Sequence, residues 1–288
     1  KTMQEIIAEY NVGNRGSFGS AYTTATTNTV FTTTDWKGTS YYFAGAPTDN
    51  WVRFGGFYWR IVRVNGDGTV RLIYNGTSTT TTGTGTLADT SEAFNSDYNR
   101  SEYVGLKYTS GQQHGQSTDS PILNTLQSWY SSSNLDNYAQ YIDTNVGFCS
   151  DRNMASGSSW SSSEHIYAAY ERIEDHRSPS PSLACTSSDI IKEPVGLITA
   201  DEAMFGGVPV FGDAIGNYLI NGQNYWTMTP GSFYTTNSSA YVFHVYSGGT
   251  IGSIARVDNT FGVRPVINLK ANTLFSGSGT STDPYVVN

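Results

Sequence analysis

The chain has 288 residues, of which 38% are hydrophobic and only 14% charged, and its formal net charge is −8. A single all-β or α+β module with large loops can absorb this length. Because the acidic balance comes without any cluster of lysine and arginine, the chain lacks the positive surface that binds nucleic acids or anionic membranes.

The composition is typical of a protein outside the cytosol. Lysine and glutamate are scarce, whereas threonine, serine, glycine and tyrosine are abundant. No apolar run approaches the roughly 18 residues that a membrane-spanning helix needs, and no signal peptide pattern stands at the first residues. We therefore expect a mature or trimmed ectodomain without direct membrane insertion.

The first third of the chain predicts a helix and then strands. Apolar residues at 3, 6, 7 and 10 indicate a short amphipathic helix, and Thr2 and Glu5 have capping-box spacing. The threonine-rich segment 23–34 is expected to be a loose lead-in or an edge strand. Segments 40–44, 51–54, 57–64 and 69–74 predict strands, with a tight hairpin turn at 65–68. Residues 76–86 are predicted to form a solvated loop.

The middle of the chain predicts helices and an irregular region, after which strands return. Ser120 followed by Pro121 indicates a helix start, and a second helix is expected over 135–141. Segment 194–198 predicts a strand that leads into a helix capped by Thr199 and Glu202. A hairpin is expected around Asn221-Gly222, and a closing strand over 283–287. This order of elements predicts an α+β fold.

Two cysteines, Cys149 and Cys185, flank the serine- and proline-rich middle region. An even number of cysteines in an extracellular protein favours a disulfide, which would hold this region in order. Two buried free thiols or one reactive thiol are the alternatives. Metal binding is not expected, because two isolated thiols do not make a zinc site.

The segment from Tyr225 to Leu269 has an unusual composition. Its interior of 31 residues, Gly231 to Phe261, contains no Lys, Glu, Gln, Met or Trp, although these five types supply 31 of the 288 residues of the chain. Tyrosine, serine, threonine, asparagine and glycine dominate instead, as in antibody loops, where rigid aromatic rings and small polar groups make the contacts. The segment therefore predicts a displayed binding surface.

Several short segments together resemble one family. They are YYFAG (41–45), FYWRIV (57–62), DGTVRLI (67–73), FCSDR (148–152), YAAY (167–170), GLITADE (196–202), YWTMTP (225–230) and GVRPVINL (262–269). They resemble bacterial surface and pilin-like proteins with a C-type lectin-like fold, in the variant shared with formylglycine-generating enzymes and with the variable proteins of diversity-generating retroelements. The resemblance spans about residues 35–288.

The resemblance implies a C-type lectin-like fold with long irregular inserts and a surface-displayed ligand-binding function. Residues 35–288 would form the binding domain, and residues 1–34 a helix and lead-in left from a pilin-like stalk. The bearer would be a bacterial cell, a pilus or a phage particle, and the ligand an unidentified protein or glycan on another cell or host surface. No cofactor and no metal are expected.

In such relatives, mutagenesis directed at adenines changes AAY codons, which never yields Lys, Glu, Gln, Met or Trp. The fixed frame would then be Trp226, Pro230, Phe233, Ala240, Val242, Phe243, Val245, Gly249, Val257 and residues 262–269. The exposed, exchangeable ligand-binding positions would be Ser232, Tyr234, Thr235, Thr236, Asn237, Ser238, Tyr241, His244, Tyr246, Thr250, Ser253, Ile254, Ala255, Arg256, Asp258, Asn259 and Thr260.

Each of these residues also has a plainer interpretation. The tyrosines could be binding anchors or half-buried sheet residues. His244 could be a catalytic base, but a lone histidine on a strand is more often a surface residue. Arg256 and Asp258 could contact a ligand or pair with each other. Arg264 could contact a ligand, but a residue of this kind more often binds a structural carboxylate. Pro265 places its strand at an edge or makes it irregular.

Enzymatic function is the competing hypothesis. No G-x-S-x-G, H-E-x-x-H, P-loop or G-x-G-x-x-G motif occurs. The cysteines lie in the middle region and not in the terminal segment, which speaks against an oxidase of the formylglycine-generating type. A glycan-active hydrolase with paired carboxylates is the other alternative. The motifs usual in calcium-dependent sugar binding are absent as well. Taken together, these observations lead us to expect a binding protein without enzyme activity.

Overall fold

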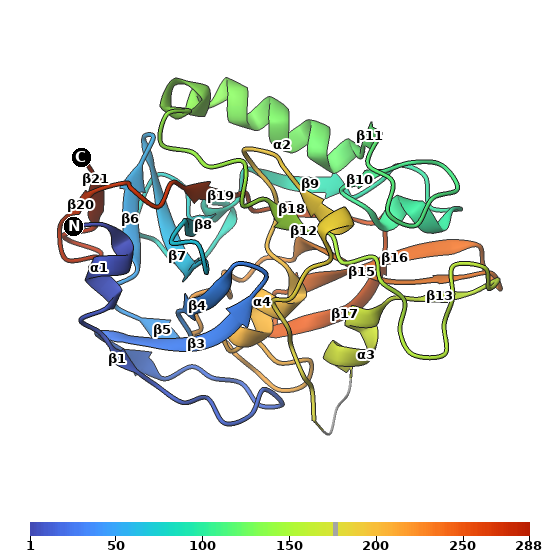
Figure 1. The fold of residues 1–288 in the computed structure, drawn as a ribbon, viewed down its shortest axis with the longest axis horizontal. Helices are drawn as coiled ribbons and strands as arrows, with labels where there is room; N and C mark the ends of the chain where they lie inside the picture. Colours follow the sequence, from blue (N-terminus) through green and yellow to red (C-terminus); the bar gives the residue numbers. More distant parts are fainter. Residues whose placement is uncertain (175–177) are drawn as a thin grey trace.

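The computed structural model describes residues 1–174 and 178–288, apart from the side chain of Ser253, and has a mixed α+β fold built mainly of strands (Figure 1). The helices are α1 (Met3–Ile7), α2 (Pro121–Ser132), α3 (Ala168–Glu174) and α4 (Ala200–Phe205), with 3₁₀ turns η1 (Thr84–Thr86), η2 (Ser101–Val104), η3 (Leu135–Tyr138) and η4 (Ser187–Asp189). Within these residues, no helix has the length and apolar character needed to cross a bilayer.

The larger sheet holds the amino-terminal strands and the carboxyl terminus. Its order is β1 (Asn11–Val12), β3 (Thr29–Asp35), β4 (Gly38–Tyr42), β7 (Phe57–Val64), β6 (Trp51–Phe54), β21 (Tyr285–Val287) and β20 (Phe275–Ser276), while β8 (Val70–Tyr74) pairs with both β7 and β19 (Val266–Leu269). The predicted β7–β8 hairpin is confirmed. The Asn65 amide donates to the Thr69 carbonyl at 2.8 Å, and Gly68 takes a positive φ of 85°, which favours glycine.

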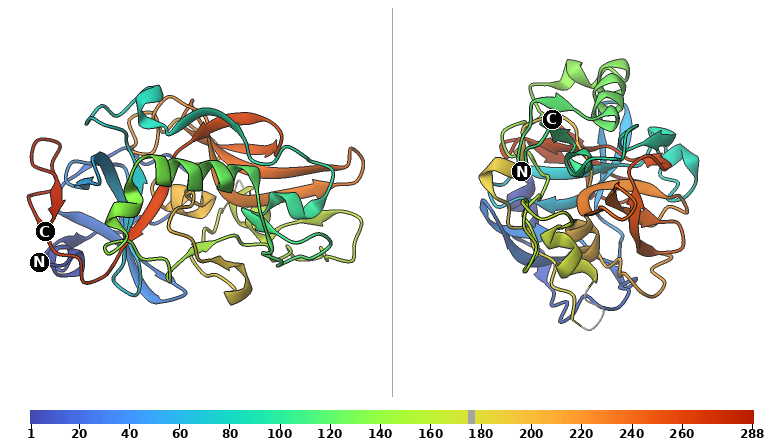
Figure 2. Two further views of the ribbon diagram at one scale, coloured as in Figure 1. Left: turned by 90° about the horizontal axis from the view of Figure 1, so that it is seen from above. Right: turned by 90° about the vertical axis from the view of Figure 1, so that its right-hand side faces the viewer.

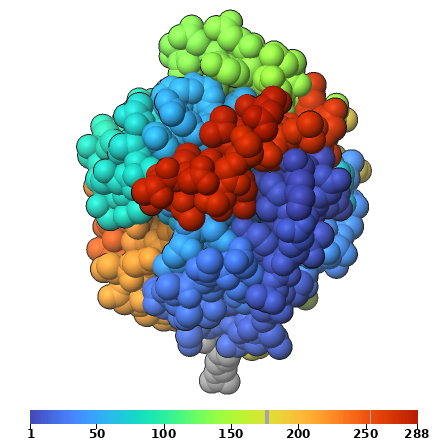
Figure 3. Space-filling view, turned by 90° about the vertical axis from the view of Figure 1, so that its left-hand side faces the viewer, coloured from blue at the N-terminus to red at the C-terminus, as the bar shows by residue number. Residues whose placement is uncertain are grey.

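The amino-terminal segment is packed into this sheet. The predicted capping box of α1 is confirmed, and Met3 and Ile7 are buried. The segment 23–34 is not a loose lead-in, because β3 pairs with strands on both sides and buries Val30 and Phe31. The boundary expected between residues 34 and 35 falls inside β3. Figure 3 shows the two ends of the chain side by side, where the Phe275 amide donates to the Lys1 carbonyl at 2.9 Å.

The second sheet carries most of the segment 225–269. Its order is β17 (Thr250–Arg256), β16 (Ser239–Tyr246), β15 (Tyr225–Tyr234), β18 (Thr260–Val263) and β9 (Asp89–Ala93), and β13 (His165–Ile166) pairs with the outer part of β15. Three small ladders join β2 (Ala25–Thr26) to β5 (Ala46–Pro47), β10 (Lys107–Tyr108) to β11 (Thr118–Asp119) and β12 (Phe148–Cys149) to β14 (Ile190–Ile191). The tip of the β15–β16 hairpin lies at the end of the molecule away from the termini (Figures 1 and 2).

Three predicted elements differ from the structure. The helix expected over 135–141 is only the turn η3, and the strand expected over 194–198 is a single bridge between Gly196 and Val266. The hairpin expected around Asn221-Gly222 does not form. Tyr218 instead donates its amide to the Gly45 carbonyl, which draws residues 217–220 into a turn against another part of the chain. The predicted starts of α2 and α4 are confirmed by their caps.

The GVRPVINL segment is interrupted, as the proline predicts. β18 ends at Val263 and β19 begins at Val266, so that Pro265 lies between two strands. Arg264 was expected to bind a structural carboxylate, but it pairs with none among the residues that the structure describes. Its guanidinium donates to the carbonyls of Tyr74 at 2.8 Å and Leu219 at 3.2 Å, and these backbone acceptors satisfy a buried cation at the strand break.

Candidate binding face

The predicted ligand-binding positions lie on β15, β16, β17, the first residue of β18 and the turns that join these strands. The Thr235–Ser238 loop connects β15 to β16 at the tip, and the 257–259 turn follows β17. The exposed or half-buried positions are Tyr234, Thr235, Thr236, Asn237, Ser238, Tyr241, Tyr246, Thr250, Ile254, Arg256, Asp258, Asn259 and Thr260. The backbone of Ser253 belongs to β17, but its side chain lies outside the described residues.

Three of the positions expected to be exposed are buried. Ser232 is 0% exposed because β13 pairs with β15 on one side of it and β16 on the other. His244 is 8% exposed because its ring stacks on Phe261, with ring centroids 4.5 Å apart. Ala255 is 7% exposed and lies opposite buried Val242. These residues belong to the frame and not to the displayed surface.

Most of the remaining positions form two groups. Tyr241 lies near the tip end of β16, whereas Tyr246 lies at its other end, with Thr250 paired opposite it on β17. At about 3.3 Å per residue, the five-residue step from Tyr241 to Tyr246 separates them by roughly 17 Å along the strand. We call the group at the tip, Tyr234–Ser238, Tyr241, Arg256, Asp258 and Asn259, the hairpin face.

Side chains of the hairpin face are held by one another. The rings of Tyr234 and Tyr241 meet edge to face with centroids 5.7 Å apart, and the Asn237 amide donates to the Tyr241 hydroxyl at 2.8 Å. Arg256 lies opposite Tyr241 on β17 and pairs with Asp258, with Nη2 2.8 Å from Oδ2. The aromatic side chains are therefore positioned before any ligand arrives, which lowers the entropy lost on binding.

The hairpin face extends onto a residue that the sequence does not single out. The guanidinium of Arg256 lies over the ring of Tyr98, 4.2 Å from its centroid, and the Ala240 amide donates to the Tyr98 carbonyl at 2.8 Å. Tyr98 is half-buried and comes from the segment after β9. It is brought to the face only by tertiary packing, because nothing in its local sequence indicates a binding role.

The frame beneath the face is buried as expected. Trp226, Val242, Phe243, Val245 and Val257 are all 0% exposed. The Trp226 indole donates to the Glu92 carbonyl at 2.8 Å, which links β15 to β9. A Cβ on Gly231 would lie 2.0 Å from the Ile254 side chain, so glycine is needed where this side chain from β17 packs on β15. Phe233 was expected to belong to this buried frame, but it is only half-buried.

A groove of about 750 Å³ lies beside the hairpin face. Its walls include Ile166, Tyr170, Glu164, Glu171 and, from the hairpin loop, Thr235. Burial raises the pKa of Tyr170, and the nearby Tyr234 raises it further, so these two rings join the groove to the face. The groove combines apolar and hydroxyl-bearing walls with carboxylates. Tyr170 belongs to the YAAY motif, but nothing in the sequence indicates that it binds a ligand.

The predicted disulfide between Cys149 and Cys185 is confirmed, with the two Cα atoms 5.9 Å apart. It closes a loop over a sequence separation of 36 that includes β13, α3 and the groove wall. Both thiols are consumed in this bond, so neither serves as a reactive thiol in this structure.

A serine and a histidine form a hydrogen-bonded pair near β13. The Ser101 hydroxyl bonds to Nδ1 of His165, and Nε2 of His165 donates to the Trp160 carbonyl at 2.9 Å. The Trp160 ring stacks on the imidazole, and both Ser101 and His165 are 6% exposed. A substrate could not reach a nucleophile placed in this way, so we interpret the pair as a structural bond between η2 and β13.

Over residues 1–174 and 178–288, no group of three or more His, Cys, Asp or Glu side chains is arranged to hold a metal ion. No family model, no curated protein and no solved structure matches this chain.

Proposed function

We propose that this protein is a surface-displayed binding protein that recognises a protein or glycan ligand through the hairpin face and the adjoining groove. The observation that carries the proposal is the contrast within β15–β17. Exposed Tyr, Thr, Asn and Ser side chains stand on a frame whose own side chains are buried. Tyrosine supplies large contact area at low entropic cost, and the small polar residues supply adaptable hydrogen bonds.

The same contrast supports the proposal that the segment is diversified by a retroelement on a C-type lectin-like scaffold. Replacing an exposed loop residue such as Asn237 costs little stability, whereas replacing Trp226 would open a cavity in the core. An extracellular location on a bacterial cell, pilus or phage is part of the proposal. The disulfide supports that location, because disulfides persist in oxidising compartments.

The binding proposal is tested by removing the two face tyrosines. Wild-type protein is screened on a glycan array and, by flow cytometry, on intact cells, and the ligand found is titrated against Tyr234→Ala and Tyr241→Ala. Each variant is expected to weaken binding about 30-fold or more, because hot-spot tyrosines contribute about 2 kcal/mol or more. Tyr138→Ala, which removes a 37% exposed tyrosine elsewhere, is the matched control and is expected to bind like the wild type.

Equal binding by the face variants and the wild type would contradict the proposal, as would an equal loss in Tyr138→Ala. Steady conversion of a bound glycan into products would favour the hydrolase alternative. The diversification proposal has its own test in the DNA around the gene. We expect a near-copy of the codons for residues 225–269 that differs at adenines and lies beside a reverse transcriptase gene, and natural variants that differ at exposed face positions but not at Ser232, His244 and Ala255.

A further inference from the structure

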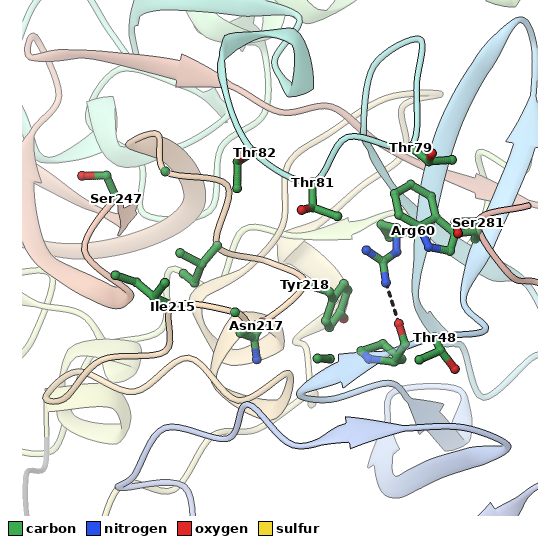
Figure 4. Close-up of a pocket in the computed structure, with 16 residues that line it drawn as sticks. Thr48, Arg60, Thr79, Thr81, Thr82, Ile215, Asn217, Tyr218, Ser247 and Ser281 are labelled. Atoms are coloured by element: carbon green, nitrogen blue, oxygen red, sulfur yellow. Dashed lines mark hydrogen bonds between the residues drawn. The ribbon is translucent and has the colours of Figure 1, made fainter.

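A second cavity lies at the other end of the sheet from the hairpin tip. It has a volume of about 450 Å³, within the roughly 300–1,000 Å³ typical of sites for small molecules. Distant parts of the chain meet there, namely the strands β5, β6 and β7, the 79–82 loop, the 215–222 segment, Ser247 and Ser281 (Figure 4). Ser247 directly follows the end of β16, so a whole strand of eight residues separates this cavity from the hairpin loop.

One buried cation faces this cavity. Arg60 on β7 is 3% exposed, and its Nε donates to Asn50 Oδ1 at 2.7 Å while Nη2 donates to the Pro47 carbonyl at 2.8 Å. The guanidinium lies 4.0 Å from the centre of the Trp51 ring. Figure 4 shows the group directed toward the space between Thr81 and Tyr218. Two of the five N–H donors of an arginine are thus bound by the protein, and Nη1 has no acceptor among the described residues.

Arg60 differs in this respect from most of the buried arginines. Arg63, Arg71 and Arg152 each lie within 4.0 Å of a carboxylate oxygen. Arg60 forms no such pair with any residue described, and burial lowers its pKa to about 9. The nearby Asp49 carboxylate opposes part of this lowering of the pKa but forms no ion pair with Arg60. Burying a cation without an ion-paired carboxylate is costly, so an anionic group that entered the cavity would gain strong interaction with Nη1.

The rest of the lining has the character of a sugar site. Hydroxyl groups surround the cavity, and they come from Thr48, Thr79, Thr81, Thr82, Ser247 and Ser281. Trp51, Tyr218 and Ile215 add apolar surface, on which the C–H face of a sugar ring can pack. A single cation matches one carboxylate better than a doubly charged phosphate or sulfate. The many hydroxyl groups match a ligand that carries several hydroxyls of its own.

We propose that this cavity binds an acidic monosaccharide, with its carboxylate on Nη1 of Arg60 and its hydroxyl groups on the threonine loop. The site is independent of the hairpin face. It would give the protein a fixed specificity for acidic glycans beside a face that is free to change.

Calorimetric titration of the full chain at pH 7 with glucuronic acid and with N-acetylneuraminic acid tests the proposal. At least one acidic sugar is expected to bind, and glucose, which lacks the carboxylate, is expected to bind at least tenfold more weakly. Thr81→Trp fills the cavity from an exposed loop and is expected to reduce the affinity at least tenfold. Thr80→Trp is the matched control, because Thr80 is exposed on the same loop but does not line the cavity, and it is expected to bind like the wild type.

Arg60→Gln is the second variant, with circular dichroism to verify its fold, and it is expected to remove the preference for glucuronic acid over glucose. The proposal is overturned if neither acidic sugar binds, if glucose binds as tightly as the acidic sugar that binds better, or if Thr81→Trp leaves the affinity for that sugar unchanged. Inorganic sulfate that binds as tightly as either acidic sugar would also overturn it, because the cavity would then recognise charge alone. Loss of ligand binding in the hairpin-face variants has no bearing on this outcome.

Discussion

At the scale of single residues, a buried charged cluster links the larger sheet to α4. Glu202 on α4 accepts from Arg63 Nε at 2.8 Å and from Arg71 Nη1 at 2.9 Å, and Arg63 also pairs with Asp35 at 2.7 Å. All four side chains are 1% exposed. Burial by itself would raise the pKa of Glu202, but Arg71 and Arg63 lower it to about 2. The carboxylate therefore stays charged at neutral pH.

Glu202→Gln is expected to lower the free energy of unfolding at pH 7 by about 3–5 kcal/mol, because it leaves Arg71 buried without its carboxylate partner and Arg63 with Asp35 alone. Because the pKa of Glu202 is lowered on folding, its charged form stabilises the fold at any pH above the glutamate pKa of the unfolded chain, about 4.3. This stabilisation is lost as the pH falls toward 2. Urea unfolding of both proteins between pH 7 and pH 2 measures how the free energy of unfolding depends on pH. The wild type should lose more stability over the acid range than Glu202→Gln does.

Glu9→Gln is the control for this comparison, because its side chain is 68% exposed in a surface pair with Lys1. Such pairs contribute about 1 kcal/mol at most. If Glu202→Gln cost no more than Glu9→Gln, the charged cluster would not hold α4 to the sheet.

At the scale of elements, the disulfide holds the segment that forms the groove wall. Between β12 and β14, which pair with each other, the residues that the structure describes contain only β13, α3, η4 and irregular structure. Few backbone hydrogen bonds of regular structure restrain this segment, so the cross-link carries much of the restraint. The position of Tyr170 beside Tyr234, and hence the continuity of groove and face, depends on this segment.

The double substitution Cys149→Ser with Cys185→Ser is expected to lower the free energy of unfolding by about 4 kcal/mol, the loop-closure entropy for a separation of this size. Urea unfolding of the oxidised wild type and the double variant gives the difference. Hydrogen exchange is expected to quicken in β13 and α3 while β7 and β8 stay protected. A change below about 1 kcal/mol with unchanged exchange would show that packing alone orders the segment.

At the scale of the whole molecule, the two ends of the chain complete the larger sheet. α1 buries Met3 and Ile7 in the main core, and β20 and β21 close the sheet beside it (Figure 3). A separate stalk remnant would contribute little to the stability of the rest, whereas a packed segment contributes through the core that it shares.

Ile7→Ala is expected to lower the free energy of unfolding by about 2–5 kcal/mol through the cavity it leaves. Val12→Ala, at a side chain 59% exposed in the same segment, is the matched control, and its effect is expected to stay within about 0.5 kcal/mol. Thermal and urea unfolding of the two variants provide the comparison. Equal small effects would mean that residues 1–12 are an appendage to the fold.

The sequence by itself determined the local structure. The capping boxes at Thr2 and Thr199, the start of α2 at Ser120 and the turn at Asn65 all depend on residues within four positions of one another, so their signals are complete in a short stretch. The displayed loop at 235–238 was predictable for a related reason, because small polar residues between apolar strands cannot form core.

Only the tertiary structure decided which strand residues are covered. His244 and Ser232 have the composition of exposed positions, but Phe261 and the neighbouring strand β13 bury them from elsewhere in the chain. In the same way, the local sequence of Arg60 is that of an ordinary strand residue. The cavity around it is formed by loops from both halves of the chain. Burial depends on what packs against a face, and for a strand those neighbours lie far away in the sequence, so no local pattern specifies them.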